Sequence, residues 1–134
     1  MSAKIILPRV LQIGAGASKE VGAILKSMGL NRPLIVTDKI MVQLGYIERI
    51  MECMSAVEIS ADVFDDTVPE PTVSSIRAGV DQVRSGNYDC IIALGGGSPI
   101  DSAKAIAILG KYGGEMRDYK FPRIVDEPGL PIIA

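Results

Sequence analysis

The sequence predicts an α/β domain built around a largely parallel β-sheet. Short apolar runs alternate along the chain with segments whose apolar residues recur every three or four positions, as on one face of a helix. The run 90–94 is continuously apolar, which is typical of a strand covered on both faces. Hydrophobic residues make up 48% of the 134 residues, enough to form a buried core.

The first elements are expected near the amino terminus. The apolar run 10–13 predicts a strand that ends at the turn 14–16 (Gly-Ala-Gly). Ser18 can then cap a helix, because apolar residues follow it at helical spacing, and Gly29 is a suitable helix terminator. We therefore expect a strand, a turn and a helix over residues 10–29.

Two further strands are expected before residue 64. The run 34–37 predicts a strand with Asp38 at its carboxyl end, followed by a broken helical stretch. Apolar and polar residues alternate over 57–63, which predicts a strand with one face in solvent, near an edge of the sheet.

The second half repeats this alternation. Residues 69–72 (Pro-Glu-Pro-Thr) form a rigid loop before a helix whose inner face carries Val73, Ile76, Val80 and Val83. The strand 90–94 leads through three glycines into a helix from about residue 99 to 109, which Gly110 should stop. Residues 111–129 are expected to be loop-like, and 130–134 a strand. An apolar strand is an unusual place for a natural terminus, so we expect the chain to be a fragment.

Charge and residue types exclude several classes of function. The net charge is −2 and its 14 basic and 16 acidic residues are interspersed, which argues against a nucleic-acid partner. The apolar runs are too short to span a membrane. No histidine is present, so the usual base of a serine or cysteine triad and the commonest metal ligand are missing. Cys53 and Cys90 lack metal-ligand spacing, and reduced cysteines indicate a cytoplasmic protein.

The glycine-rich stretch 94–104 is the most informative part of the sequence. Three glycines after a buried strand let backbone amides approach a ligand without side-chain clashes. Ser98 can cap the next helix, Pro99 suits its first position, and Asp101 completes the spacing of a capping box. The resulting helix amino terminus suits a diphosphate. The alternative is a tight strand-to-helix turn with ordinary capping.

The string Gly95-Gly96-Gly97-Ser98-Pro99-Ile100-Asp101-Ser102-Ala103-Lys104 resembles the signature of the iron-containing alcohol dehydrogenase family. The pieces 14–17, 35–38 and 68–72 are similar to the same family, in the same order. The likeness covers nearly the whole chain but only about the amino-terminal third of a family member. It implies that residues 1–134 are a truncated dinucleotide-binding domain, Rossmann-like and doubly wound, without the family's carboxyl-terminal all-helical domain.

The resemblance also implies a set of cofactor-binding residues. Gly96, Gly97 and Ser98 would hold the pyrophosphate of NAD. Asp38 would hold the adenosine ribose, and its position 22 residues after Gly16 is near the spacing expected for such an acid. A carboxylate there repels a 2′-phosphate, which favours NAD over NADP; the alternative is that Asp38 only caps a helix.

Two further acids belong to the implied site with alternatives left open. Glu70 stands where many family members carry asparagine near the cofactor, and a solvated loop acid is the other interpretation. Asp101 would face the nicotinamide side, and a cap in the first helical turn is compatible with that role.

The implied activity is the interconversion of an alcohol and an aldehyde or ketone by hydride transfer to NAD. A divalent iron or zinc ion would polarise the oxygen in the full-length enzyme, which would be a homo-oligomer acting on a small alcohol or aldehyde. The metal ligands would lie in the missing helical domain, so no catalytic or metal residue is assigned here and the fragment alone is expected to be inactive. Alternatives are a same-fold relative such as a glycerol dehydrogenase, maleylacetate reductase or dehydroquinate synthase, and a non-catalytic nucleotide-binding module.

Overall fold

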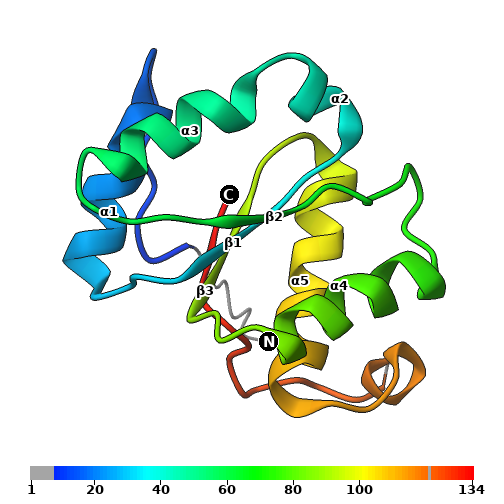
Figure 1. Cartoon of the computed structure of the whole chain (residues 1–134). Helices are drawn as coiled ribbons and strands as arrows, with labels where there is room; N and C mark the ends of the chain where they lie inside the picture. Colours follow the sequence, from blue (N-terminus) through cyan, green and yellow to red (C-terminus); the bar gives the residue numbers. More distant parts are fainter. Residues whose placement is uncertain (1–7, 121) are drawn as a thin grey trace.

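The computed structural model describes residues 8–120 and 122–134 and contains a four-stranded parallel sheet (Figure 1). Its strand order is β2-β1-β3-β4, and every pairing is parallel. The strands are β1 (Pro33–Val36), β2 (Asp62–Phe64), β3 (Cys90–Ala93) and β4 (Ile132–Ile133). The predicted α/β class with a parallel sheet is confirmed.

Helices cover both faces of the sheet. α1 (Val21–Met28) and α3 (Tyr46–Ser55) pack on one face, and α4 (Val73–Ser85) and α5 (Gly97–Tyr112) on the other (Figure 1). Successive strand residues point to opposite faces, so Ile35 packs with α1 and α3 while Leu34 packs with α4 and α5. The short α2 (Lys39–Gln43) and the 3₁₀ turns η1 (Ala17–Glu20) and η2 (Met116–Tyr119) complete the described elements.

Two predicted helices have different boundaries from those expected. α1 ends at Gly29 as predicted, with a left-handed φ of 69°, but η1 precedes it and Ser18 makes no capping bond. α5 runs from Gly97 to Tyr112 rather than from 99 to 109. Gly110 does not stop the helix, because it lies inside α5 against Val83 of α4.

Two strand predictions are wrong in whole or in part. Residues 10–13 form no strand, and Val10, Leu11 and Ile13 are 62%, 72% and 85% exposed. A short apolar run does not specify a strand unless a neighbouring strand pairs with it. In the 57–63 segment only the last two residues belong to β2, because a turn with Glu58 at φ 62° follows α3. The predicted edge position of that strand is confirmed.

The order of the strands creates a switch point between β1 and β3. The chain passes from β1 outward to β2, then returns to β3 on the other side of β1 and moves outward to β4. Loops leaving β1 and β3 therefore separate in opposite directions at the carboxyl edge, where ligands of open α/β sheets bind. The predicted loop 111–129 is loop-like apart from the end of α5 and η2.

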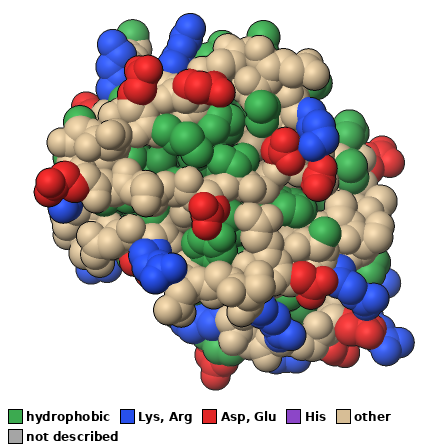
Figure 2. Space-filling view, viewed as in Figure 1, with side chains coloured by type: hydrophobic (Ala, Val, Ile, Leu, Met, Phe, Trp, Pro, Cys, Tyr) green, Lys and Arg blue, Asp and Glu red, His purple; other side chains and the backbone are tan. Residues whose placement is uncertain are grey.

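The surface carries mixed charge. Figure 2 shows acidic and basic side chains interspersed around apolar side chains that lie across the middle of this face. Within residues 8–120 and 122–134, no helix combines the length and the apolar character needed to cross a bilayer.

Candidate functional site

The predicted site residues that follow β1 and β3 lie together at the switch point. Val36 and Ala93 are partners in the sheet, and Asp38 and Gly95 follow them by two residues each. A β-carbon at Gly95 would lie only 3.5 Å from the Asp38 Oδ2 atom. The fold therefore brings one carboxylate next to the glycine turn, although 57 positions separate them in the chain.

The three glycines of the turn have different surroundings. Gly95 adopts φ +142°, and a β-carbon there would lie 2.7 Å from Cγ of Pro99, so the fold itself requires glycine. A β-carbon at Gly96 or Gly97 would meet no atom within 4 Å. The backbone at Gly96 and Gly97 is thus open to a ligand, and the protein leaves space directly above it.

The amino terminus of α5 presents backbone amides to this space. The first helical hydrogen bond runs from the Ile100 amide to the Gly96 carbonyl at 3.4 Å, and Pro99 has no amide hydrogen. Among the described residues, the amides of Gly96, Gly97 and Ser98 have no hydrogen-bond acceptor. A helix of 16 residues with free amides at its positive end can bind an anion.

The predicted cap of this helix is wrong. Gly96, in an extended conformation, occupies the N-cap position, and Ser98 lies within the first turn without a capping bond. Pro99 occupies the third helical position rather than the first. The helix begins earlier than expected because the extended Gly96 backbone ends the turn, and the amides are left uncapped.

Asp38 caps a helix, which was one of the two roles that the sequence left open, and its contact with the ribose stays a prediction. Its Oδ1 atom accepts a hydrogen bond of 2.9 Å from the Met41 amide and caps α2. Its other oxygen lies toward Gly95, and the side chain is only half-buried. The cap orients the carboxylate and leaves one oxygen available to a ligand at the switch point.

Asp101 is placed differently from the predicted capping box. It lies in the second turn of α5, exposed, and forms an ion pair of 3.2 Å with Lys104. The spacing of three residues from Ser98 therefore has no capping function, because Ser98 is not the N-cap.

Glu70 lies on the loop between β2 and α4, at the same edge of the sheet. It is exposed and has a left-handed φ of 54°, a conformation that glycine and asparagine adopt more readily than glutamate. Within the described part of the chain, no ion pair or side-chain hydrogen bond involves Glu70. These surroundings match a solvated loop acid, which was one of the two interpretations of Glu70.

The turn 14–16 does not follow the strand predicted at 10–13, because those described residues form no strand and Val10, Leu11 and Ile13 are exposed. The spacing of 22 residues between Gly16 and Asp38 therefore does not begin at the strand end that the prediction assumed. The position of Asp38 rests instead on the end of β1 and on its proximity to Gly95.

Two threonines that were not predicted as site residues lie under the site. Thr37 and Thr67 are buried, and both hydroxyls form hydrogen bonds at the carboxyl ends of the strands. A hydroxyl residue at the end of the apolar run 34–37, directly before an acid, was the signal in the sequence.

Lys39, the residue after Asp38, is paired with two carboxylates of the loop after β2. The neighbouring cation, Lys39, contacts Asp65 at 3.0 Å and Asp66 at 2.9 Å. The hydrogen bonds that Lys39 donates to Asp66 and then to Asp65 raise the pKa of Lys39, so it stays charged and bound to the loop after β2.

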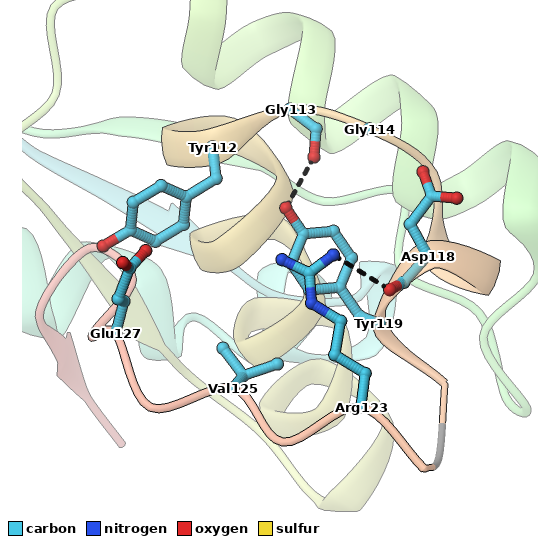
Figure 3. A pocket seen from close by; sticks show the side chains of 8 residues that line it. All are labelled: Tyr112, Gly113, Gly114, Asp118, Tyr119, Arg123, Val125 and Glu127. Carbon is cyan, nitrogen blue, oxygen red and sulfur yellow. Dashed lines mark hydrogen bonds between the residues drawn. The ribbon is translucent and has the colours of Figure 1, made fainter.

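Two other features lie outside this site. The described residues contain no group of three or more histidine, cysteine or acidic side chains that could hold a metal ion. A pocket of about 500 Å³ lies beyond the carboxyl end of α5, at the opposite edge of the sheet (Figure 3). Some of its polar groups pair with one another: Tyr119 donates to the Gly113 carbonyl, and Arg123 stacks on Tyr119 and donates to the Asp118 carbonyl.

Comparison with known proteins gives a family match over most of the chain. A sequence model described as "Iron-containing alcohol dehydrogenase" matches residues 8–134. An NAD-dependent methanol dehydrogenase of Bacillus methanolicus is 34% identical over 96% of the chain, and a lactaldehyde reductase of Escherichia coli K12 is 32% identical over all of it. The chain spans about a third of the length of these relatives, 34% and 36%.

Solved structures give the same result for the fold. A 1,3-propanediol oxidoreductase aligns with a TM-score of 0.91 and 28% identity, and a sulfoacetaldehyde reductase from Bifidobacterium kashiwanohense in complex with NAD+ aligns with 0.86 and 28%. Each alignment covers 98% of this chain and 35% of the other.

Proposed function

The chain belongs to the iron-containing alcohol dehydrogenase family, and we propose that it is the NAD-binding domain of an NAD-dependent alcohol dehydrogenase. It corresponds to the amino-terminal part of family members, and its relatives include proteins named as an NAD-dependent methanol dehydrogenase and a lactaldehyde reductase. We propose that residues 1–134 form the dinucleotide-binding domain and that a helical domain completes the enzyme.

One observation carries the proposal: the Asp38 carboxylate lies beside Gly95, directly next to the free amides of 96–98. NAD carries adjacent groups that match this pair. The diphosphate would accept hydrogen bonds from the amides of Gly96, Gly97 and Ser98 at the positive end of α5. The ribose hydroxyls would donate to the free oxygen of Asp38.

The same charges favour NAD over NADP. A 2′-phosphate on the ribose would meet the Asp38 carboxylate, and the nearest cation along the chain, Lys39, is already bound by Asp65 and Asp66. We propose that Asp101 lies toward the nicotinamide side. We also assign Glu70 to the cofactor, because its loop lies at the same edge of the sheet as the glycine turn.

In the reaction, this domain binds and orients the cofactor, which supplies the hydride chemistry when bound. The metal proposed for the full-length enzyme, iron or zinc, would be held by residues outside this chain. We therefore propose that the chain alone is inactive, that the complete enzyme is homo-oligomeric and acts on a small alcohol or aldehyde, and that it is cytoplasmic.

Calorimetric titration of the protein with NAD, ATP and FMN tests the proposal. We expect saturable heat with NAD and weaker or no heat with FMN. Folded protein that binds FMN in preference to NAD would support the non-catalytic nucleotide-binding module instead.

A further inference from the structure

Thr37 joins the two strands on which the site is built. Its hydroxyl donates a hydrogen bond of 2.8 Å to the carbonyl of Leu94, the residue before Gly95. In a continued parallel ladder, the amide of Asp38 would be the donor to this carbonyl, since the Leu94 amide donates to the Val36 carbonyl. The hydroxyl takes that place, so Asp38 leaves the sheet to cap α2 while the strands stay joined.

Thr67 holds Thr37 from the other side. The Thr67 hydroxyl donates to the Thr37 carbonyl at 2.7 Å, and the Thr67 amide donates to the same oxygen at 3.3 Å. The Thr37 amide donates to the Phe64 carbonyl at 2.9 Å. One residue thus connects the ends of β1, β2 and β3.

Burial makes these bonds difficult to replace. The exposed fractions of Thr37 and Thr67 are 0% and 6%, so water cannot easily substitute for a lost hydroxyl. A carbonyl left without its donor in such a place carries a desolvation cost, and the strand ends would shift to relieve it.

We propose that Thr37 is a positioning residue that sets the separation between the Asp38 carboxylate and the amides of 96–98, and that Thr67 supports it. The inference rests on the proposed NAD site. A ligand can make both contacts at once only when the separation of the carboxylate and the amides matches the distance from its ribose to its diphosphate. A site that is already held at this separation loses less entropy on binding. Adenosine uses the carboxylate alone, whereas ADP uses both.

The test compares ADP with adenosine on Thr37→Val and Thr37→Ser by calorimetric titration. Valine keeps the shape of threonine without the hydroxyl, and serine keeps the hydroxyl. For Thr37→Val we expect the ADP affinity to fall by about tenfold, with adenosine affinity changed by less than about threefold. Thr37→Ser is expected to restore most of the ADP affinity.

A matched control separates positioning from general loss of stability. Val83→Ala removes buried methyl groups at the opposite end of α4 and is expected to destabilise the protein without changing the ratio of ADP to adenosine affinity. Thr67→Val is a second variant that retains the amide bond to Thr37. It should show a smaller loss in the same direction.

Equal losses for ADP and adenosine in Thr37→Val, or no rescue by serine, would overturn the positioning role while leaving the proposed function intact. An unsubstituted protein that binds neither NAD nor ADP would contradict the proposed function, and this inference with it.

Discussion

The backbone of Gly95 packs against the ring of Pro99, four residues later in the chain. A β-carbon at Gly95 would lie 2.7 Å from Pro99 Cγ, and the φ of +142° is one that other residues rarely adopt. Gly96 and Gly97, one and two positions on, have open space where a side chain would stand. The turn thus contains one glycine that the fold needs and two that face the proposed ligand.

This difference predicts that alanine at Gly95 lowers stability, whereas alanine at Gly96 weakens NAD binding. Gly95→Ala should lower the free energy of unfolding by about 1–3 kcal/mol, because it combines a strained φ with a clash. Gly96→Ala should change it by less than about 0.5 kcal/mol, yet weaken NAD binding, because the methyl group occupies the space of the diphosphate. Urea denaturation and calorimetric titration measure the two effects. A stable Gly95→Ala protein, or full NAD affinity in Gly96→Ala, would contradict this assignment of the glycines.

Asp38→Asn tests the charge at the ribose position. Asparagine can still accept the Met41 amide hydrogen bond, so helix α2 keeps its cap and stability should be nearly unchanged. The preference for NAD over NADP should fall by about tenfold, because the 2′-phosphate no longer meets a carboxylate. Dissociation constants for both cofactors give the ratio. Glu48→Asn, which removes an exposed carboxylate of α3, is the control, and an unchanged ratio in Asp38→Asn would count against the ribose contact.

Helix α1 lies very close to the carboxyl end of helix α3 at Gly22. A β-carbon there would lie 2.5 Å from the Cys53 carbonyl oxygen and 2.9 Å from Val57 Cγ2. Gly22→Ala is therefore expected to lower the free energy of unfolding by roughly 1–3 kcal/mol. This loss should appear although alanine favours a helix over glycine by about 1 kcal/mol. Urea denaturation measures it, with Ser27→Ala at an exposed position of α1 as the control; equal stability of Gly22→Ala and the parent would refute the close packing.

The sequence predicted the fold where periodicity was strong and burial complete. The apolar runs at 34–37 and 90–94 became the two central strands. Helices cover both faces of the sheet at these strands, so apolar residues are favoured at every position in them. The run 10–13 looked the same in composition but formed no strand, since pairing depends on neighbours that a local pattern does not reveal.

The cofactor roles of the candidate site residues stay predictions, and only their placement can be compared with the structure. Asp38 lies next to Gly95, the first residue of the glycine turn. The start of α5 was misplaced by two residues, because Ser98 and Pro99 both suit a helix start and sequence propensity cannot choose among nearby caps. The Thr37 and Thr67 bonds depend on three strand ends meeting in space, which no local pattern predicts.

Asp89 should make stability depend on pH. Burial alone would raise its pKa, but amide hydrogen bonds from Asn31 at 2.7 Å and Arg32 at 3.0 Å outweigh it and hold the pKa below its usual value. A depressed pKa stabilises the folded state above the unfolded-state pKa of about 4, and this contribution is lost as the pH falls through the folded-state value.

Asp89→Asn should therefore be less stable than the parent at pH 7, with the gap closing as the pH falls below about 4. Urea denaturation at several pH values measures the gap. Asp126→Asn removes an exposed carboxylate and serves as the control. A gap that stays constant across this range would show that the two amide bonds do not depend on the charge of Asp89.

We propose that the amides of 96–98 bind the diphosphate of NAD. Amide NMR spectra of the ¹⁵N-labelled protein, recorded during an NAD titration, show which residues the cofactor contacts. We expect the largest saturable shifts at Gly96, Gly97 and Ser98, with Asp38 also affected. Saturable shifts that cluster elsewhere, for example around the pocket of Tyr112 and Tyr119, with the 96–98 signals unmoved, would contradict the account.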